Sequence, residues 1–372
     1  MRIARGATKT MDAKKIRDTL KEKAPGRLLL RLLSLLYISA VVLRRILYGF
    51  GLLKSYKLPV PVICFGNLSS GGTGKTSTVV MAAIELKKEG YRPAVLIRGY
   101  KRKASGKKLT ILSEGEAFSA EEAGDEALML FKMLRDYGVP VLVSSDRYQS
   151  GLAALEKFKS DILLMDDGYQ FFRLQRDKNV ALINTAMPFH KDALLPLGDL
   201  RETPAGLDRA DAIILSHCEH ASEAVIESLK EKIKKINPSA DVLESMHSPE
   251  IFLNALSKEK IPLSEFQGKS VVTLSGIGDP KSFEDTLVSL KAVPAQIWRY
   301  PDHHQFTREE LSAIQSTRAT MPLITTFKDF ARFPPDWARI LKDGVFILSV
   351  KIVFLRDGHE QLMKTITSVK HL

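Results

Sequence analysis

The segment that most restricts the fold is a glycine-rich loop between an apolar run and a helical pattern. Residues 61–65 read PVICF, residues 66–76 read GNLSSGGTGKT, and a helix is predicted over residues 75–88. A strand, a glycine-rich loop and a helix in this order form the context that a phosphate-binding loop requires. Glycines let backbone N–H groups point at a phosphate, and the helix N-terminus contributes the positive end of its dipole. The loop therefore predicts nucleoside triphosphate binding.

The residues of this loop have distinct expected parts. Lys75 is expected to reach the β- and γ-phosphates, and the Thr76 hydroxyl is expected to hold Mg²⁺. The strict motif has glycine where this chain has Ser69, while the GGTGKT core is intact. The alternative, an unrelated glycine-rich turn, leaves the Lys-Thr pair at this offset unexplained. The predicted nucleotide-binding residues are Ser69, Ser70, Gly71, Gly72, Thr73, Gly74, Lys75 and Thr76.

A second acidic element is expected at the end of a buried strand. Residues 161–167 read DILLMDD, four apolar residues followed by Asp166 and Asp167. Either aspartate fits the role of fixing Mg²⁺, directly or through a water. Many strands end in aspartate at a turn, so this element gains its meaning from the phosphate-binding loop. The chain contains no N-K-x-D run of the kind that reads guanine, which makes ATP the expected nucleotide.

Strand and helix patterns alternate after residue 57, which predicts an α/β fold. We expect a P-loop NTPase-type parallel sheet with helices on both faces over residues 58–245. A smaller α/β domain is expected over residues 246–372, with a hinge in the segment 238–265 and a cleft between the two domains. One continuous helix is predicted over residues 121–137.

The N-terminal arm, residues 1–57, carries most of the net charge. It holds seven Arg and seven Lys against three acidic residues, a net charge of +11 of the +12 in the chain. The balanced body argues against a nucleic-acid enzyme, whose basic charge is usually spread over the body. Residues 32–43 are uncharged, and twelve residues make a helix of ~18 Å, short of a ~30 Å bilayer core. We therefore predict a monotopic helix lying in the membrane interface; the alternative is a helix buried against the body.

Several polar residues are candidates for the acceptor side of the reaction. Asp125 lies in the first turn of a predicted helix, where an aspartate can also serve only to stabilise the helix dipole. Asp302 and His303 follow a predicted strand, and the plain alternative for them is a surface loop. Residues 217–220 read HCEH, which is not a recognised zinc spacing. The predicted substrate-binding residues are Asn67, Arg98, Arg201 and Asp302.

Together these motifs resemble the tetraacyldisaccharide 4′-kinases of lipid A synthesis, and they are spread over nearly the whole chain. The resemblance is carried by LLY at 35–37, GNLSSGGTGKT at 66–76, RGYKRK at 98–103, GDEALML at 124–130, DDGYQFFRLQRD at 166–177, LLPLGDLRETPAGLDRAD at 194–211, SGIGDPKSF at 275–283, PDHHQFT at 301–307 and TFKD at 326–329.

The resemblance implies that the γ-phosphate of ATP is transferred to the 4′-hydroxyl of a tetraacyldisaccharide 1-phosphate. It implies that Asp125 is the base that accepts the hydroxyl proton and that His303 pairs with it. Asp166 and Asp167 would serve the metal and the phosphates. It also implies a monotopic enzyme on the cytoplasmic face of the bacterial inner membrane, with no obligate protein partner evident from the sequence.

The chain departs from the family pattern at three positions, Phe171 for His, Ala127 for Pro and Phe327 for Glu. None of these is a predicted catalytic group. Two other functions stay open from the residues alone. One is a membrane-docked P-loop ATPase that acts as a nucleotide switch and recruits partners, and the other is a soluble small-molecule kinase whose N-terminal helix belongs to the core. The two cysteines, Cys64 and Cys218, are too few for a disulfide framework or a four-cysteine zinc site.

Overall fold

The computed structural model describes residues 13–99, 102, 108–113, 120–302, 304–342 and 344–369. The predicted base partner His303 lies outside the described residues.

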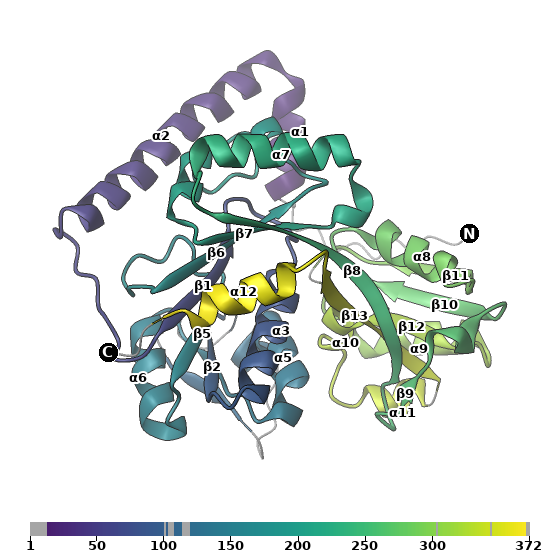
Figure 1. Ribbon diagram of the computed structural model, residues 1–372. Coiled ribbons are helices and arrows are strands. Elements are labelled where there is room, and N and C mark those ends of the chain that lie inside the picture. The colour runs from purple at the N-terminus through teal and green to yellow at the C-terminus, as the bar shows by residue number, and fades with distance from the viewer. Residues whose placement is uncertain are drawn as a thin grey trace.

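The phosphate-binding loop follows the central strand of a largely parallel sheet (Figure 1). Strand β1 (Val62–Asn67) is buried along its whole length and pairs in parallel with β5 and β6 on its two sides. The order in this half of the sheet is β7-β6-β1-β5-β2-β4-β3, with only β3 antiparallel. The other strands are β2 (Pro93–Ile97), β3 (Thr110–Leu112), β4 (Val141–Val143), β5 (Ile162–Asp166), β6 (Lys178–Asn184) and β7 (Ala212–Ser216).

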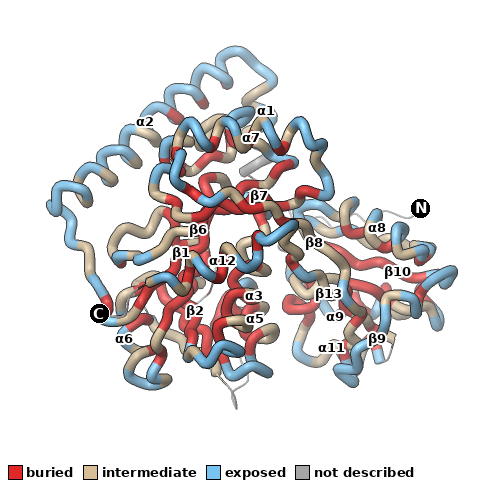
Figure 2. Tube along the Cα trace, in the orientation of Figure 1, coloured by how far each residue is buried: buried red, intermediate tan, exposed pale blue. Residues whose placement is uncertain are grey.

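Both faces of this sheet are covered by helices, as the alternating pattern predicts. Side chains along a strand point to opposite faces in turn, so Ile63 and Phe65 enter one core cluster while Val62 and Cys64 enter the other. The first cluster is closed by α3 (Lys75–Lys88) and α5 (Asp125–Leu134). The second is closed by α6 (Arg147–Phe158) and α7 (Glu223–Ile236). Figure 2 shows the resulting buried centre.

The prediction of one helix over residues 121–137 is wrong. The segment divides into α4 (Ala120–Ala123), α5 and the short 3₁₀ helix η1 (Arg135–Tyr137). The break is at Gly124, whose φ of 87° lies outside the helical region and is accessible mainly to glycine. The break places Asp125 at the first position of α5, where its backbone can be aimed independently of α4.

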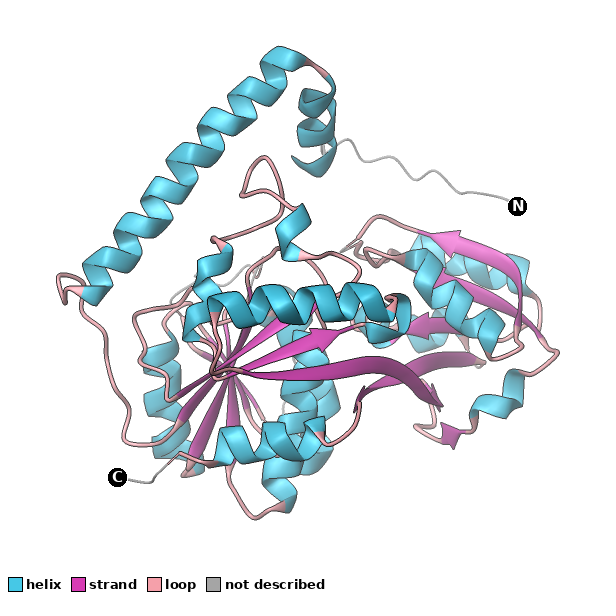
Figure 3. Cartoon of the chain, turned by 45° about the horizontal axis from the view of Figure 1, so that its top comes forward, coloured by secondary structure: helices cyan, strands magenta, loops and turns pink. Residues whose placement is uncertain are grey.

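A 14-residue strand, β8 (Asp241–Asn254), joins the two halves of the molecule (Figure 3). Its beginning pairs in parallel with β7, and its remainder pairs antiparallel with β13 (Val345–Phe354) of the second half. The expected hinge segment 238–265 therefore contains this strand, and the expected boundary at residue 245 falls inside it. The proline and serine content of this segment did not indicate a strand, because the strand pairs with residues that are distant in the sequence.

The second half has the strand order β11-β10-β12-β13-β8, and β9 pairs with β8. Thr307 caps α9 through a reciprocal capping box with Glu310, which fixes the start of this helix. The elements are β9 (Lys260–Ile261), β10 (Ser270–Ser275), β11 (Val293–Arg299), β12 (Leu323–Thr326), α8 (Pro280–Ser289), α9 (Arg308–Arg318), α10 (Phe327–Phe330) and α11 (Trp337–Leu341).

The last helix, α12 (Gly358–Thr367), returns to the first half. Its residues Leu362, Met363 and Ile366 belong to the same core cluster as Ile63 and Phe65. The chain after β13 thus contributes to the core of the nucleotide-binding half, although the expected domain limits assign it to the second domain. The second half is inserted between β8 and α12.

The described part of the N-terminal arm forms two helices, α1 (Ala13–Glu22) and α2 (Ala24–Gly49), set apart from the sheet in Figure 3. Helix α2 has 26 residues, so the uncharged stretch 32–43 understated its length. It is long and apolar enough to cross a membrane by length and composition, with a mean hydropathy of 1.8 over its best window. Only 17% of that window is buried against the rest of the chain.

Candidate active site

The phosphate-binding loop is shaped by its glycines and by neighbouring segments. Gly71 and Gly74 have φ values of 138° and 78°, in the region that favours glycine. The buried Asn67 amide donates to the Thr73 hydroxyl at 3.1 Å, so this predicted substrate-binding residue also braces the loop. The backbone N–H of Ser70, in the loop, donates to the carbonyl of Asp199, which lies outside the loop, at 2.7 Å. These contacts brace the phosphate-binding loop ahead of α3.

The two consecutive aspartates at the end of β5 are held in different electrostatic states. Asp166 is only 2% exposed, and Thr76 Oγ1 donates to its Oδ2 at 3.5 Å. Burial, with a further contribution from the Glu126 carboxylate, raises the pKa of Asp166 to about 7. Its Oδ1 is buried without a hydrogen-bond partner in the described part of the chain. A buried oxygen with no donor, beside the Thr76 hydroxyl, fits a Mg²⁺ ligand.

Asp167 is paired with cations instead. Arg201 Nη1 donates to both of its carboxylate oxygens at 2.8 and 2.9 Å, and Lys75 Nζ lies 3.6 Å from Oδ1. Burial alone would raise the pKa of Asp167, but the charges of Lys75 and Arg201 outweigh it and lower the pKa below its ordinary value. The predicted residues Lys75, Asp167 and Arg201 therefore form one charged group next to the loop.

The raised pKa of Asp166 leads to a prediction about how the stability of the protein depends on pH. Because its pKa is about 7 in the folded chain against an ordinary value of 3.8, the native state binds more protons than the unfolded state between these values. Without Mg²⁺, the free energy of unfolding should therefore fall as pH rises through this window. Excess Mg²⁺, which favours the carboxylate, should reduce the fall.

Thermal melts at several pH values, with and without Mg²⁺, measure this effect. Asp166→Asn should flatten the metal-free pH slope, while the same change at Asp285, an exposed aspartate of α8, should leave it intact. A slope equal in the wild type and in Asp166→Asn would contradict the prediction.

The second half of the molecule reaches Asp125 directly. Gln305 Nε2 donates to both carboxylate oxygens of Asp125 at 3.0 and 3.1 Å, and Arg332 Nε donates to Oδ2 at 3.2 Å. The Arg332 side chain is fully buried, and its Nη1 also donates to the Gly276 carbonyl at 3.0 Å. Asp125 is thus gripped by residues more than 170 positions away in the sequence.

Sequence reasoning missed Arg332 and Gln305. Gln305 is two residues beyond His303, so the expectation that this stretch approaches Asp125 had the right segment. Arg332 stands three residues after Asp329 in TFKDFAR, and its Nη1 lies 3.4 Å from Asp329 Oδ1. That spacing of opposite charges on a helical turn was the available signal. Asp302 points to Lys328, with a separation of 3.4 Å.

The remaining candidates lie near the same edge of the sheet. Arg98 is exposed just after β2, at the carboxyl end where ligands of parallel sheets bind. Phe171, at the position where the family pattern has histidine, packs under the guanidinium of Arg147 with 4.6 Å from the guanidinium carbon to the ring centroid. This cation–π contact gives the substituted side chain a structural use.

A phosphate-binding loop after the central strand, with two consecutive aspartates at the end of the neighbouring strand, defines a P-loop enzyme that binds the phosphates of ATP. A sequence model of the family described as tetraacyldisaccharide-1-P 4′-kinase matches residues 26–369. The chain belongs to this family.

Individual relatives agree with the family match. The chain is 41% identical to a tetraacyldisaccharide 4′-kinase of Elusimicrobium minutum, over 92% of this chain and 91% of the relative. It is 37% identical to one of Syntrophus aciditrophicus, over 85% of this chain and 86% of the relative. The solved "apo" form of LpxK from Aquifex aeolicus in complex with ATP is similar with a TM-score of 0.72 and 32% identity, covering 95% of this chain and 99% of that one.

These matches confirm the predicted fold class and activity. The chain is an ATP-dependent kinase of lipid A biosynthesis that transfers phosphate to the 4′-hydroxyl of a tetraacyldisaccharide 1-phosphate, with Mg²⁺ as cofactor.

Proposed function

We propose that Asp125 is the general base of this kinase and that the second half of the molecule sets its position. The proposal rests on the hydrogen bonds that the Asp125 carboxylate accepts from Arg332 Nε at 3.2 Å and from Gln305 Nε2 at 3.0 Å. Asp125 begins helix α5, which packs on α3, the helix that follows the phosphate-binding loop, on the same face of the sheet.

In this mechanism the 4′-hydroxyl oxygen attacks the γ-phosphorus of ATP. The bond to the β–γ bridging oxygen breaks, ADP leaves, and the hydroxyl proton passes to Asp125. Thr76 and Asp166 would hold Mg²⁺, which supplies neutralisation of phosphate charge. Lys75 contributes a cation on the β- and γ-phosphates, while Arg201 holds Asp167 in its charged form. His303 stays a predicted partner of Asp125.

Both oxygens of Asp125 accept hydrogen bonds from Gln305 in this structure. An oxygen that takes a proton must be free to face the substrate, so we propose that the acceptor hydroxyl displaces Gln305. Arg332, which is buried and anchored to Gly276 and Asp329, stays in place and orients the carboxylate. It is a positioning residue in this scheme.

The activity is tested by incubation with labelled ATP and a tetraacyldisaccharide 1-phosphate in mixed micelles, followed by location of the new phosphate on the sugar. Label at the 4′-position is expected. ATP hydrolysis without labelled lipid would instead support the switch-ATPase alternative.

We also propose that α2 docks the enzyme on the cytoplasmic face of the inner membrane without crossing it. The side of α2 that faces the body carries polar contacts. Ser34 Oγ donates to the Leu194 carbonyl at 3.0 Å, Tyr37 to the Arg201 carbonyl at 2.9 Å, and Arg45 pairs with Asp208 at 2.7 Å. A helix held along the body by these groups lies beside the site rather than leading away from it.

The opposite side of α2 is a leucine surface. We define it by the exposed residues Leu28, Leu29, Leu32, Leu33, Leu35, Leu36, Leu43 and Ile46, whose exposed fractions run from 42% to 68%. On a helix that packs on a water-soluble protein, apolar residues face the core. On α2 they face away from the rest of the protein, which indicates that this side of the helix contacts an apolar medium. The acyl chains of the substrate belong to the same medium, since each CH₂ moved into water costs about 0.8 kcal/mol.

Charges on the leucine surface should release the enzyme from lipid. Leu32→Glu with Leu36→Glu is expected to abolish flotation with anionic vesicles, because two carboxylates would enter the apolar layer. The double change Leu256→Glu with Val288→Glu is the matched control, since both residues are 57% exposed in the second half. Equal flotation of the two double variants would contradict docking through α2.

A further inference from the structure

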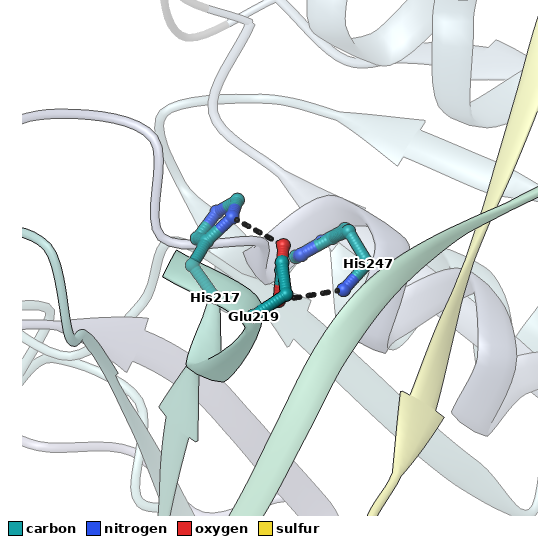
Figure 4. A group of neighbouring side chains, drawn as sticks. All are labelled: His217, Glu219 and His247. Atoms are coloured by element: carbon teal, nitrogen blue, oxygen red, sulfur yellow. Dashed lines mark hydrogen bonds and ion pairs between the residues drawn. The ribbon is translucent and has the colours of Figure 1, made fainter. Parts of the chain in front are cut away.

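Three side chains behind the phosphate-binding loop form a compact cluster that the kinase mechanism does not use. His217 and Glu219 follow β7, with Glu219 in the short helix η4 (Cys218–His220), and His247 comes from the neighbouring strand β8 (Figure 4). One ligand atom from each lies within 4.8 Å of the other two. His217 Nδ1 is 3.4 Å from Glu219 Oε1, and the two imidazole rings stack with centroids 4.2 Å apart.

The cluster is incompletely satisfied as a set of hydrogen bonds. His247 Nδ1 is buried and has no partner among the described residues. Its backbone amide donates to Glu219 Oε2 at 3.3 Å, which fixes the carboxylate beside the rings. A buried ring nitrogen without a partner costs free energy that a bound cation can recover. Two imidazoles and one carboxylate are also a donor set that binds metals.

We propose that His217, Glu219 and His247 bind a divalent transition-metal ion of the zinc type, with a fourth position open to solvent. Zinc bonds of about 2.0–2.1 Å to nitrogen and oxygen put tetrahedral ligand atoms about 3.3 Å apart. The His217–Glu219 separation of 3.4 Å already matches, and a ligand atom of His247 lies within 4.8 Å of both. Imidazole ligands favour zinc, cobalt, nickel and copper, whereas the oxygen ligands Thr76 and Asp166 favour Mg²⁺.

The position of this site gives it a connection to nucleotide binding. A β-carbon added at Gly74 of the phosphate-binding loop would lie 2.7 Å from His247 Cε1 and 3.0 Å from Nε2. The ring edge of His247 thus supports the loop from behind. A metal bound to His247 would hold this ring in place, and so would restrict the position of Gly74, which packs against it.

The HCEH run alone did not indicate the site because its third ligand is on another strand. β7 and β8 run in parallel, so the residues that follow Leu215 lie beside those that follow Glu244. His217 and His247 therefore meet at one end of the sheet, by a pairing that spacing along the chain does not reveal.

The test is titration of the metal-free, full-length protein with Co²⁺ in excess Mg²⁺, so that oxygen-ligand sites are filled. A visible absorption band of tetrahedral cobalt with imidazole ligands is expected at one equivalent. Zn²⁺ should displace the cobalt and raise the melting temperature. Glu219→Gln and His217→Ala should each lower cobalt affinity by at least the roughly tenfold loss caused by changes to supporting residues of metal sites.

His190→Ala, at an exposed histidine outside the cluster, is the matched control and should bind cobalt as the wild type does. Glu219→Gln preserves side-chain size, and its circular dichroism spectrum checks that the chain is folded. The proposal is overturned if the wild type shows no cobalt band, or if Glu219→Gln and His217→Ala bind cobalt unchanged. A loss of ATP affinity in His217→Ala without any cobalt site would also overturn it, and would assign the cluster to the nucleotide.

Discussion

Asp125→Asn is expected to lower kcat by about 10²–10⁴, the range that a positioned base contributes, while ATP affinity stays at the wild-type level. Asparagine keeps the size of the side chain and can still accept a hydrogen bond from Arg332, whose Nε lies 3.2 Å from Oδ2 in the wild type. It cannot take a proton from the acceptor hydroxyl. The loss should therefore be found in kcat measured with saturating lipid.

The matched control is Asp136→Asn, because Asp136 is a 79% exposed aspartate just beyond the far end of the same helix. That variant should keep the wild-type rate. A double-mutant cycle adds the role of Arg332: in an Arg332→Met background, Asp125→Asn should cost less than it does alone, since the two residues act as a unit. Full activity of Asp125→Asn would remove the base assignment.

Lys75→Met is the second change with a large expected effect, a fall in kcat/KM of about 10²–10³ or more. The side chain is 12% exposed and its ammonium group is the cation expected on the β- and γ-phosphates. Methionine retains much of the packing but none of the charge. Asp167 keeps Arg201 at 2.8 Å, so the local fold should survive the substitution.

Single-turnover transfer to the lipid acceptor measures this loss, and isothermal titration with ATP separates binding from chemistry. Lys87→Met, at an exposed lysine near the C-terminal end of the same helix, serves as the control. Transfer by Lys75→Met at the rate of this control would show that the loop does not use its lysine as predicted.

Local patterns allowed the nucleotide-binding half to be predicted well. The helix expected over residues 75–88 is α3, because a glycine-rich start and a run of buried positions determine it within a few turns. Asp166 and Asp167 follow β5 as expected, since four apolar residues and a turn suffice to mark that strand. These features depend on neighbours in sequence.

The parts that could not be predicted depend on distant residues. Gly124 breaks a helix that composition alone favours, and β8 exists because β7 and β13 pair with it. Arg332 meets Asp125 across the two halves, and His247 meets His217 across two strands. The pattern around each of these residues is ordinary, so only the tertiary structure reveals the contact.

The paired strands β8 and β13 restrict how the kinase can move. The chain enters the second half through β8 and leaves it through β13, and these strands lie side by side in antiparallel register. Because two adjacent strands connect the halves, sliding or rotation of one half against the other would disrupt the pairing of these strands. Bending of the two-stranded ribbon is the easiest deformation that keeps the pairing. We therefore expect the two halves to move relative to each other mainly by bending of this ribbon, which would change the separation of Asp125 and Arg332.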